Sequence, residues 1–454
     1  MVLGRAVELK YLNTYYDREG SQIMVVYGEK NIGKTALLSQ FVQDKPFHYY
    51  RARSASEREQ RYQWGKELSK EEVKTLKYPS FTEILQSLMK NHKGKKVIII
   101  DEFQYIVKAS EGFIGELVNF AHSGWQNSEV MVILCSSSIG WVENSMITKI
   151  GSAAYELSGF LKIKELDFEF MMEYFPGFGM EKSIEAYAVL GGVPGLWKLF
   201  NDKISIKENI CRNILDPAKY LYGEGQRIVE RELRETGVYN TILASIAADN
   251  HKLNDLYLHT EFSRAKISVY LKNLMELELV EKVFSYDTEG KENVQKGIYR
   301  IKNHFVHFYF TFIFPNLSCL ESMTGVEFYN RFIGPYFKTY VSEYYKTVCA
   351  QRMKQWNKWG KLPFNAVQFG EWVGKFGNID IIAKGEKGET IIGLCNFDKP
   401  MMRYDDYEWL LFCAEKAKLK ADYVYLFSVS RFDEKLDLEA KVKQNLKLIT
   451  VEEM

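Results

Sequence analysis

Three apolar runs in the first third of the chain have the length of buried β-strands. They read IMVVY at residues 23–27, VIII at 97–100 and VMVILC at 130–135. Helical patterns separate them, such as FTEILQSLMKN at 81–91. Runs that are apolar at every position fit strands covered on both faces, and their alternation with helices favours a parallel sheet with crossover helices. We therefore expect an α/β fold with a ligand at the carboxyl edge of the sheet.

A glycine-rich segment, GEKNIGKT, follows the first of these runs and precedes the helical segment ALLSQFV. It matches the pattern GxxxxGK[ST] of a phosphate-binding loop, in which backbone N–H groups surround a phosphate chain. Lys34 would neutralise the β and γ phosphates, and the Thr35 hydroxyl would bind Mg²⁺. A simple glycine turn is the structural alternative. The residues expected to contact the nucleotide are Gly28, Glu29, Lys30, Asn31, Ile32, Gly33, Lys34, Thr35 and Ala36.

Polar residues end the other two predicted strands. Asp101 and Glu102 follow the run at 97–100, and acids at the end of a buried strand are costly unless they serve a purpose. We expect Asp101 to hold Mg²⁺, and Glu102 to activate the attacking water as a general base. An exposed acidic turn is the alternative. The third strand ends in three serines, and we expect Ser137 to sense the γ phosphate, although serines also commonly begin helices.

Composition and charge limit the classes of protein to which this chain can belong. The chain has 454 residues, which is too long for one ordinary core, and its 60 basic residues nearly balance 59 acidic ones. No overall charge therefore attracts it to nucleic acid or an anionic membrane. The six cysteines form no CxxC pair, and the longest apolar stretch, at 305–314, is far shorter than the roughly 20 residues that span a bilayer. These features predict a cytoplasmic protein without a membrane partner.

Four motifs together resemble the archaeal-type and related bacterial P-loop ATPases of the AAA+ and STAND class. They are LGRAVELKYL at 3–12, the glycine-rich segment, DEFQYI at 101–106 and YAVLGGVPGLW at 187–197. The resemblance covers about residues 3 to 200. It implies that the nucleotide is ATP, and that Gly4, Arg5 and Pro194 lie near it. By itself, GGVPG reads only as a turn between helices.

One departure from this family concerns hydrolysis. Such ATPases often carry Gly-Arg where this chain has Gly151 followed by Ser152. If that arginine serves a neighbouring subunit, we expect slow hydrolysis here. Arg51, Arg53 and Arg58 are possible substitutes, and the sequence does not choose among them.

The middle of the chain, from 237 to 303, shows three short helices followed by two strands around a polar turn, which is a winged-helix pattern. Ser263 is the expected N-cap of the third helix. That helix could reach DNA through Arg264, Lys266 and Lys272, yet the segment holds nine basic and nine acidic residues and should bind a polyanion weakly. Its expected buried stripe consists of Val269, Leu271, Leu274 and Leu277.

The last third resembles the domain of unknown function that is fused to such ATPases, which is similar to the PD-(D/E)xK nuclease fold. A long helix at 333–353 precedes strands at 364–373, 378–385, 389–397 and 422–429. Asp380 supplies the first acid of a nuclease site. The expected Glu-x-Lys reads Leu394, Cys395, Asn396, which suits neither a hard cation nor a nucleophile. We expect this domain to be catalytically inactive.

These observations lead to one main expectation and two alternatives. We expect an ATP-binding and Mg²⁺-dependent ATP-hydrolysing switch, with a P-loop core at 1–160, a helical lid and connector at 161–236, a winged helix at 237–315 and a nuclease-like domain at 316–454. The first alternative is a nucleotide-binding scaffold with negligible turnover that recognises a protein partner or a second copy of itself. The second is an ATP-dependent DNA-binding protein.

Overall fold

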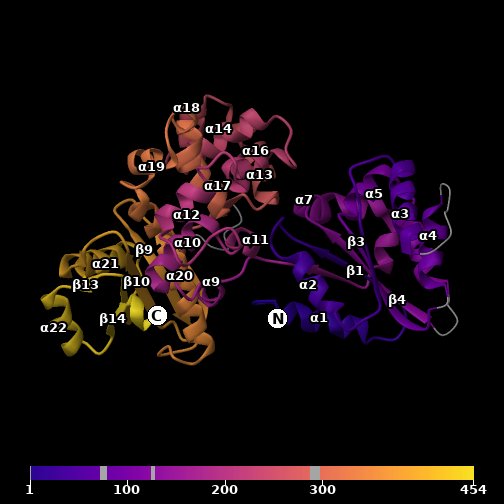
Figure 1. Cartoon of the computed structure of the whole chain (residues 1–454). Helices are drawn as coiled ribbons and strands as arrows, with labels where there is room; N and C mark the ends of the chain where they lie inside the picture. The colour runs from indigo at the N-terminus through magenta and orange to yellow at the C-terminus, as the bar shows by residue number, and fades with distance from the viewer. Residues whose placement is uncertain (1, 72–78, 91, 124–127, 287–296) are drawn as a thin grey trace. The chain divides into compact units, whose positions relative to one another are not determined.

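The computed structural model describes residues 2–71, 79–90, 92–123, 128–286 and 297–454 (Figure 1). The chain divides into two compact units. The first contains the residues up to Leu166 together with Val193–Leu196, and the second contains Asp167–Gly192 and Trp197–Met454. The short segment Val193–Leu196 thus belongs to the first unit although its flanking residues belong to the second.

A five-stranded parallel sheet forms the centre of the first unit, as the apolar runs predicted. Its order is β2-β3-β4-β1-β5, so β1 lies between strands that come much later in the chain. In an open parallel sheet the ligand binds at the carboxyl edge beside such a reversal of strand order. The strands are β1 (Gln22–Tyr27), β2 (Phe47–Arg51), β3 (Gly94–Asp101), β4 (Ser128–Ser136) and β5 (Gly159–Lys162).

Helices cover both faces of this sheet (Figure 1). On one face α1 (Ala6–Tyr16) packs beside α2 (Lys34–Phe41). On the other, apolar side chains of the strands form a core with several helices, in which Trp64 stacks on Tyr50 with ring centroids 4.3 Å apart. Those helices are α3 (Glu57–Glu71), α4 (Phe81–Met89), α5 (Gln104–Ala109) and α6 (Phe113–His122). The segment before β5 contains α7 (Ile139–Trp141), η1 (Val142–Met146), α8 (Ile147–Ile150) and η2 (Gly151–Glu156).

The second unit begins with a helical region. It contains α9 (Phe168–Tyr174), α10 (Gly179–Leu190), α12 (Ile206–Asn213), η3 (Tyr220–Gly223) and α13 (Glu224–Glu230), while α11 (Pro194–Trp197) starts in the first unit. Three further helices and two antiparallel strands follow in the predicted order. They are α14 (Thr236–Ala247), α15 (Leu253–Thr260), α16 (Arg264–Glu276), β6 (Val280–Val283) and β7 (Ile298–Ile301). Most of the predicted turn between the strands, residues 287–296, lies outside the described residues.

Helix α16 confirms one expectation and corrects another. The Ser263 hydroxyl caps it by accepting a hydrogen bond from the Lys266 N–H at 3.3 Å. Leu271 and Leu274 are buried as predicted, but Val269 is 57% exposed and Ile267 takes its place in the core. The buried positions are spaced i, i+4 and i+7 from Ile267, and Val269 falls on the opposite side of that stripe.

The remainder of the second unit is a mixed sheet with a long helix before it. Helix α20 (Phe337–Lys358) precedes a sheet of order β14-β12-β10-β9-β8, in which β8, β9 and β10 are antiparallel and β10, β12 and β14 parallel. Its strands are β8 (Ala366–Val373), β9 (Asn378–Gly385), β10 (Thr390–Asn396), β12 (Tyr423–Ser428) and β14 (Leu446–Thr450). Two helices, α21 (Tyr404–Lys416) and α22 (Glu434–Val442), connect the parallel strands.

Short helical segments link the two strand-containing parts of the second unit. They are α17 (His304–Phe308), η5 (Tyr309–Ile313), η6 (Phe314–Asn316), α18 (Leu317–Ser322), α19 (Gly325–Phe328) and η7 (Tyr329–Ile333). The remaining short elements are β11 (Met401–Met402), β13 (Arg431–Phe432) and η8 (Val451–Glu453). Across the described ranges, we find no helix with the length and apolar character that crossing a bilayer requires.

Candidate nucleotide site

The glycine-rich segment forms a tight loop between β1 and α2. At Gly28 a side chain is excluded, because a Cβ there would lie 2.4 Å from the carbonyl oxygen of Ile163. Gly33 has a φ of +101°, a backbone conformation that favours glycine, and it directly precedes the first residue of α2. Both glycines of the motif are therefore required by the backbone path. The helix N-terminus that follows is suited to an anion.

Lys34 lies inside this loop. It is only 7% exposed, and its Nζ donates hydrogen bonds to the carbonyl oxygens of Gly28 at 2.7 Å and Glu29 at 2.9 Å. Burial lowers the pKa of Lys34, while the carboxylates of Glu102 and Asp101 are among the groups that oppose this shift. The ammonium group is thus held at the loop and within electrostatic reach of both predicted acids. Thr35, the next residue, is exposed.

Arg5 and the segment Val193–Leu196 hold the loop through its own backbone. The Arg5 guanidinium, 2% exposed, donates to the carbonyl oxygen of Ile32 at 2.9 Å, and Gly4 before it adopts a φ of +66°. Gly195, which follows Pro194, donates its N–H to the carbonyl oxygen of Asn31 at 2.9 Å. These contacts bring the motifs at 3–12 and 187–197, which are far apart in the sequence, to the phosphate loop. In both contacts the acceptor is a backbone carbonyl oxygen of the loop.

Asp101 is the last residue of β3, and its two carboxylate oxygens have different partners. Oδ2 accepts a hydrogen bond from the Tyr49 hydroxyl at 2.6 Å, and Oδ1 accepts one from the Glu102 N–H at 3.1 Å. Burial raises the pKa of Tyr49 well above its usual range, and the hydrogen bond to Asp101 contributes in the same direction. The hydroxyl therefore stays protonated and orients the carboxylate that we expect to hold the metal.

Glu102 is bound through one carboxylate oxygen only. Its Oε2 accepts hydrogen bonds from the Ser137 hydroxyl at 2.7 Å, the Ser137 N–H at 3.2 Å and the Gln104 side-chain amide at 2.6 Å. Burial raises the pKa of Glu102, but these hydrogen bonds outweigh it and leave the pKa below its ordinary value. Within the part of the chain that the structure describes, Oε1 has no hydrogen-bond partner. An ionised carboxylate is thus fixed by one oxygen with the other able to accept a proton.

Two residues of this arrangement were not predicted from the sequence. Tyr49 lies on β2, which pairs with β3, so its contact with Asp101 depends on strand order that the sequence does not display. Gln104 begins α5 and is buried, and its side-chain oxygen has no hydrogen-bond partner among the described residues. This buried amide oxygen beside Glu102 can accept a hydrogen bond from a further donor such as water.

Asp380 lies on β9 of the mixed sheet in the second unit, in a different environment. Its side chain is 6% exposed, and Oδ1 lies 3.4 Å from Lys346 Nζ while Oδ2 accepts the Cys395 N–H at 3.0 Å. Burial raises the pKa of Asp380, and Lys346 acts in the opposite direction. Leu394 and Asn396 flank Cys395 on β10, so Asp380 lies beside a backbone amide and not beside a second carboxylate from this strand. The described residues contain no cluster of three or more metal-ligating side chains.

The comparisons with known proteins agree with the motifs. Residues 3–199 match an ATPase domain predominantly from Archaea, and residues 309–404 match a domain of archaeal and bacterial proteins of unknown function. An uncharacterized protein of Methanocaldococcus jannaschii, MJECL04, is 30% identical over 399 residues, which are 86% of each chain. The chain belongs to the archaeal-type ATPase family. This membership supports ATP binding and ATPase activity in general terms.

Solved structures similar to this archaeal-type ATPase include two archaeal proteins. The Walker-type ATPase PABY2304 of Pyrococcus abyssi is 19% identical, with a TM-score of 0.46 over 68% of this chain and 96% of that one. The ORC2 protein of Aeropyrum pernix, in ADPNP–ADP complexes, is 12% identical, with a TM-score of 0.44 over 71% of this chain and 94% of that one.

Proposed function

We propose that this protein is an ATP-dependent molecular switch that hydrolyses ATP at the carboxyl edge of its parallel sheet. The observation that carries the proposal is that Lys34 and Glu102 lie near enough to interact electrostatically. Lys34 is held at the phosphate loop, and Glu102 is ionised, anchored through Oε2 and open at Oε1. A cation for the phosphates and a base for water are the two groups that phosphoryl transfer to water requires.

The residues present also fit a magnesium ion. Thr35 offers an exposed hydroxyl and Asp101 a carboxylate already oriented by Tyr49, which is the oxygen donor set that Mg²⁺ prefers. When bound, the ion would supply positive charge to the β and γ phosphates. Asp101 would hold it directly or through water, and Tyr49 would keep the carboxylate from turning away.

Lys34 must change partners when ATP binds, whereas Glu102 can keep the contacts that it already makes. Lys34 would exchange the carbonyl oxygens of Gly28 and Glu29 for phosphate oxygens, which are stronger acceptors because they are charged. Glu102 would accept a proton from water at Oε1 while Ser137 and Gln104 continue to hold Oε2. The proton is transferred to the carboxylate as the water oxygen attacks the γ phosphorus and the bond to the β–γ bridging oxygen breaks.

Hydrolysis of radiolabelled ATP by the purified full chain with Mg²⁺ tests this proposal. Lys34→Ala should lower kcat/KM, and Glu102→Gln should lower kcat about a hundredfold or more while ATP binding is retained. Lys10→Ala and Glu111→Gln remove the same charges from exposed positions and should leave the rate unchanged. Turnover that survives both Lys34→Ala and Glu102→Gln would reject the assignments.

A nucleotide-binding scaffold with negligible turnover is the second candidate. The observation that favours it is Ser152 after Gly151, where the family often carries an arginine. Without a cation from a neighbouring copy, transition-state charge on the γ phosphate is less well stabilised. Equal hydrolysis rates for the wild type and Glu102→Gln, with tight ATP binding by both, would establish this second function in place of the first.

A further inference from the structure

Arg51 is the last residue of β2, and it lies beside the acid that ends β3. In the parallel pairing of these two strands, Arg51 is the register partner of Asp101. Tyr49 precedes Arg51 by two residues and donates its hydrogen bond of 2.6 Å to the Asp101 carboxylate. Side chains two residues apart on a strand share a face of the sheet, so Tyr49, Arg51 and Asp101 lie on one face.

This face of the sheet is the one that carries the phosphate loop and α2. Tyr50, directly before Arg51, belongs to the core that the sheet forms with α3, α4, α5 and α6, so Arg51 points to the opposite face. Lys34 begins α2 on that opposite face, and Asp101 is within electrostatic reach of the Lys34 ammonium group. Arg51 is therefore a cation at the carboxyl edge, on the same face as the groups that we expect to bind the triphosphate.

The structure distinguishes Arg51 from the other two arginines that the sequence offered. Arg53 forms an ion pair with Glu67 of α3, and its guanidinium lies 5.9 Å from the centre of the Tyr50 ring. Arg58 belongs to α3 itself, which covers the face away from the phosphate loop. Arg51 is exposed and makes no hydrogen bond or ion pair with any residue in the described ranges. Its guanidinium can thus bind a ligand without breaking an existing contact.

The positive charge of Arg51 reaches the expected metal site. Burial is the largest influence on the pKa of Tyr49 and raises it, whereas the charge of Arg51 acts in the opposite direction. Neighbouring strands lie about 4.8 Å apart, which is less than the length of an extended arginine side chain, so the guanidinium can extend past Asp101. A cation beside a metal site suits a ligand that carries several negative charges, as a triphosphate does.

We propose that Arg51 supplies, from the same chain, the cation that stabilises the transition state of ATP hydrolysis. The guanidinium donates hydrogen bonds to oxygens of the γ phosphoryl group as the bond to the β–γ bridging oxygen breaks, and it transfers no proton because arginine stays protonated. This inference rests on the proposed function, whose general base and phosphate-binding lysine it leaves unchanged. It also accounts for Ser152 after Gly151, since a chain with its own arginine needs none from a neighbouring copy.

Steady-state hydrolysis and the binding of a transition-state analogue by the full chain test the proposal together. Arg51→Ala should lower kcat at least about a hundredfold with little change in KM, because an arginine that stabilises the transferred phosphoryl group contributes roughly 10³–10⁵ in kcat. The affinity for ADP with aluminium fluoride should fall by a similar factor, while the affinity for ADP alone stays unchanged. Arg53→Ala is the matched control and should behave like the wild type, since it removes an arginine two residues away whose ion pair is exposed.

A mixture of two inactive variants distinguishes an arginine of the same chain from one of a neighbouring chain. Arg51→Ala and Glu102→Gln proteins in equal amounts should show no recovery of hydrolysis, because neither chain carries both groups. Recovered activity would mean that Arg51 of one chain acts on the nucleotide of another, and it would overturn the assignment to the same chain.

Two further results would overturn the role of Arg51 while leaving the proposed function intact. They are a wild-type rate in Arg51→Ala when Glu102→Gln is inactive, and an equal loss of affinity for ADP and for ADP with aluminium fluoride. A wild-type protein that hydrolyses ATP no faster than Glu102→Gln would overturn both proposals. The thermal unfolding temperature of each variant establishes that the fold is retained. If Arg51→Ala does not fold, Arg51→Gln, which keeps a long polar side chain without the charge, takes its place under the same criteria.

Discussion

The Ser137 hydroxyl donates a hydrogen bond of 2.7 Å to Glu102 Oε2, which joins the residues that follow two neighbouring strands, β3 and β4. Glu102 adopts a φ of +54°, a conformation that non-glycine residues rarely take, and the contact with Ser137 helps to hold it there. Strain of this kind is retained where surrounding contacts fix it, often at functional sites. We therefore propose that Ser137 positions Glu102 and favours its ionised form, in addition to any contact with phosphate.

Replacing Ser137 with alanine should shift the acid limb of the pH–rate profile upward. The hydroxyl lowers the pKa of Glu102 by stabilising its ionised form, so its loss raises that pKa toward the value set by burial. Activity needs ionised Glu102. As the pH is lowered, the variant should therefore lose activity at a higher pH than the wild type does. The measurement is kcat against pH for both proteins. Ser123→Ala, a surface substitution, is the control, and an unmoved acid limb in Ser137→Ala would contradict the assignment.

Replacing Tyr49 with phenylalanine should raise the Mg²⁺ concentration needed for half-maximal ATPase activity. The variant loses the 2.6 Å hydrogen bond that orients Asp101, and a hydrogen bond to a charged group is worth about 1.5–3 kcal/mol. We expect an increase of roughly tenfold, with kcat at saturating Mg²⁺ changed much less. Tyr155→Phe changes a tyrosine that is 91% exposed and serves as the control. An unchanged Mg²⁺ requirement would show that Tyr49 has no positioning role.

Adding a methyl group at Gly195 should weaken ATP binding. A Cβ there would lie 2.6 Å from the Asn31 Cβ and 2.7 Å from the Asn31 carbonyl oxygen, so the phosphate loop or the segment Val193–Leu196 must move. Overpacking of this kind costs about 1–3 kcal/mol, which corresponds to roughly tenfold or more in affinity. Gly237→Ala is the matched control, because nothing lies within 4 Å of that position. Titration with a fluorescent ATP analogue measures the affinity of each variant. Equal affinities in Gly195→Ala and Gly237→Ala would contradict a role for this contact in ATP binding.

Duplex DNA should bind weakly at physiological salt. Helix α16 exposes Arg264, Lys266 and Lys272, but Arg264 already stacks over the Tyr257 ring at 4.1 Å, and the segment around the helix is electrically neutral. Few phosphates would be neutralised, and affinity depends on that number. Fluorescence anisotropy with a labelled duplex at about 50 and 150 mM salt measures this. Tight binding at the higher salt that Lys266→Glu abolishes would instead support an ATP-dependent DNA-binding protein.

The structural features that could be predicted from the sequence depend on residues that are close together in the chain. Apolar runs specify buried strands, Gly33 is needed by the backbone of the loop itself, and Asp101 ends a strand that Glu102 directly follows. The cap at Ser263 is equally local. Each of these features is set by residues a few positions apart, so a single sequence displays them.

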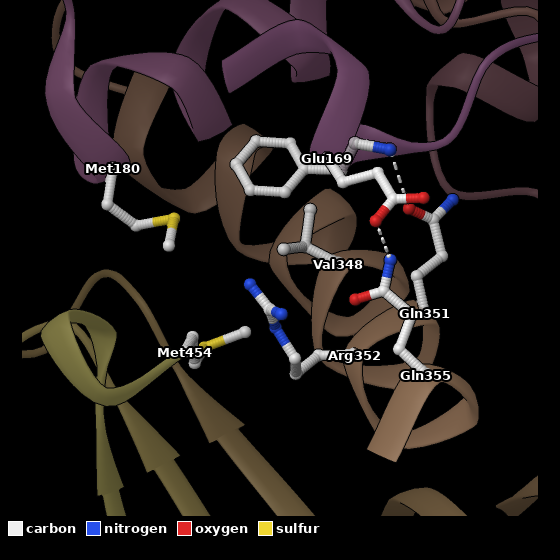
Figure 2. Close-up of a pocket in the computed structure, with 8 residues that line it drawn as sticks. Glu169, Met180, Val348, Gln351, Arg352, Gln355 and Met454 are labelled. Carbon is white, nitrogen blue, oxygen red and sulfur yellow. Dashed lines mark hydrogen bonds between the residues drawn. The ribbon is translucent and has the colours of Figure 1, made fainter. Parts of the chain in front are cut away.

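The parts that could not be predicted depend on contacts between distant segments. Tyr49 reaches Asp101 only because β2 and β3 are neighbours, and the hydrogen bond from the Phe168 N–H to the Gln351 side chain requires α9 and α20 to meet (Figure 2). Val269 was predicted to belong to the buried stripe of α16, but the structure buries Ile267 and exposes Val269. The strand β14 has only two buried residues, and its alternation is too short to identify.

A crystal structure of the full chain with a non-hydrolysable ATP analogue and Mg²⁺ tests the central claim most directly. The account predicts that the triphosphate lies in the loop at 28–35, that Lys34 Nζ has left the carbonyl oxygens of Gly28 and Glu29 for phosphate oxygens, and that Glu102 Oε1 faces a water molecule near the γ phosphate. An analogue bound elsewhere, or a loop in which Lys34 keeps both carbonyl contacts and Glu102 points away from the phosphates, would contradict it.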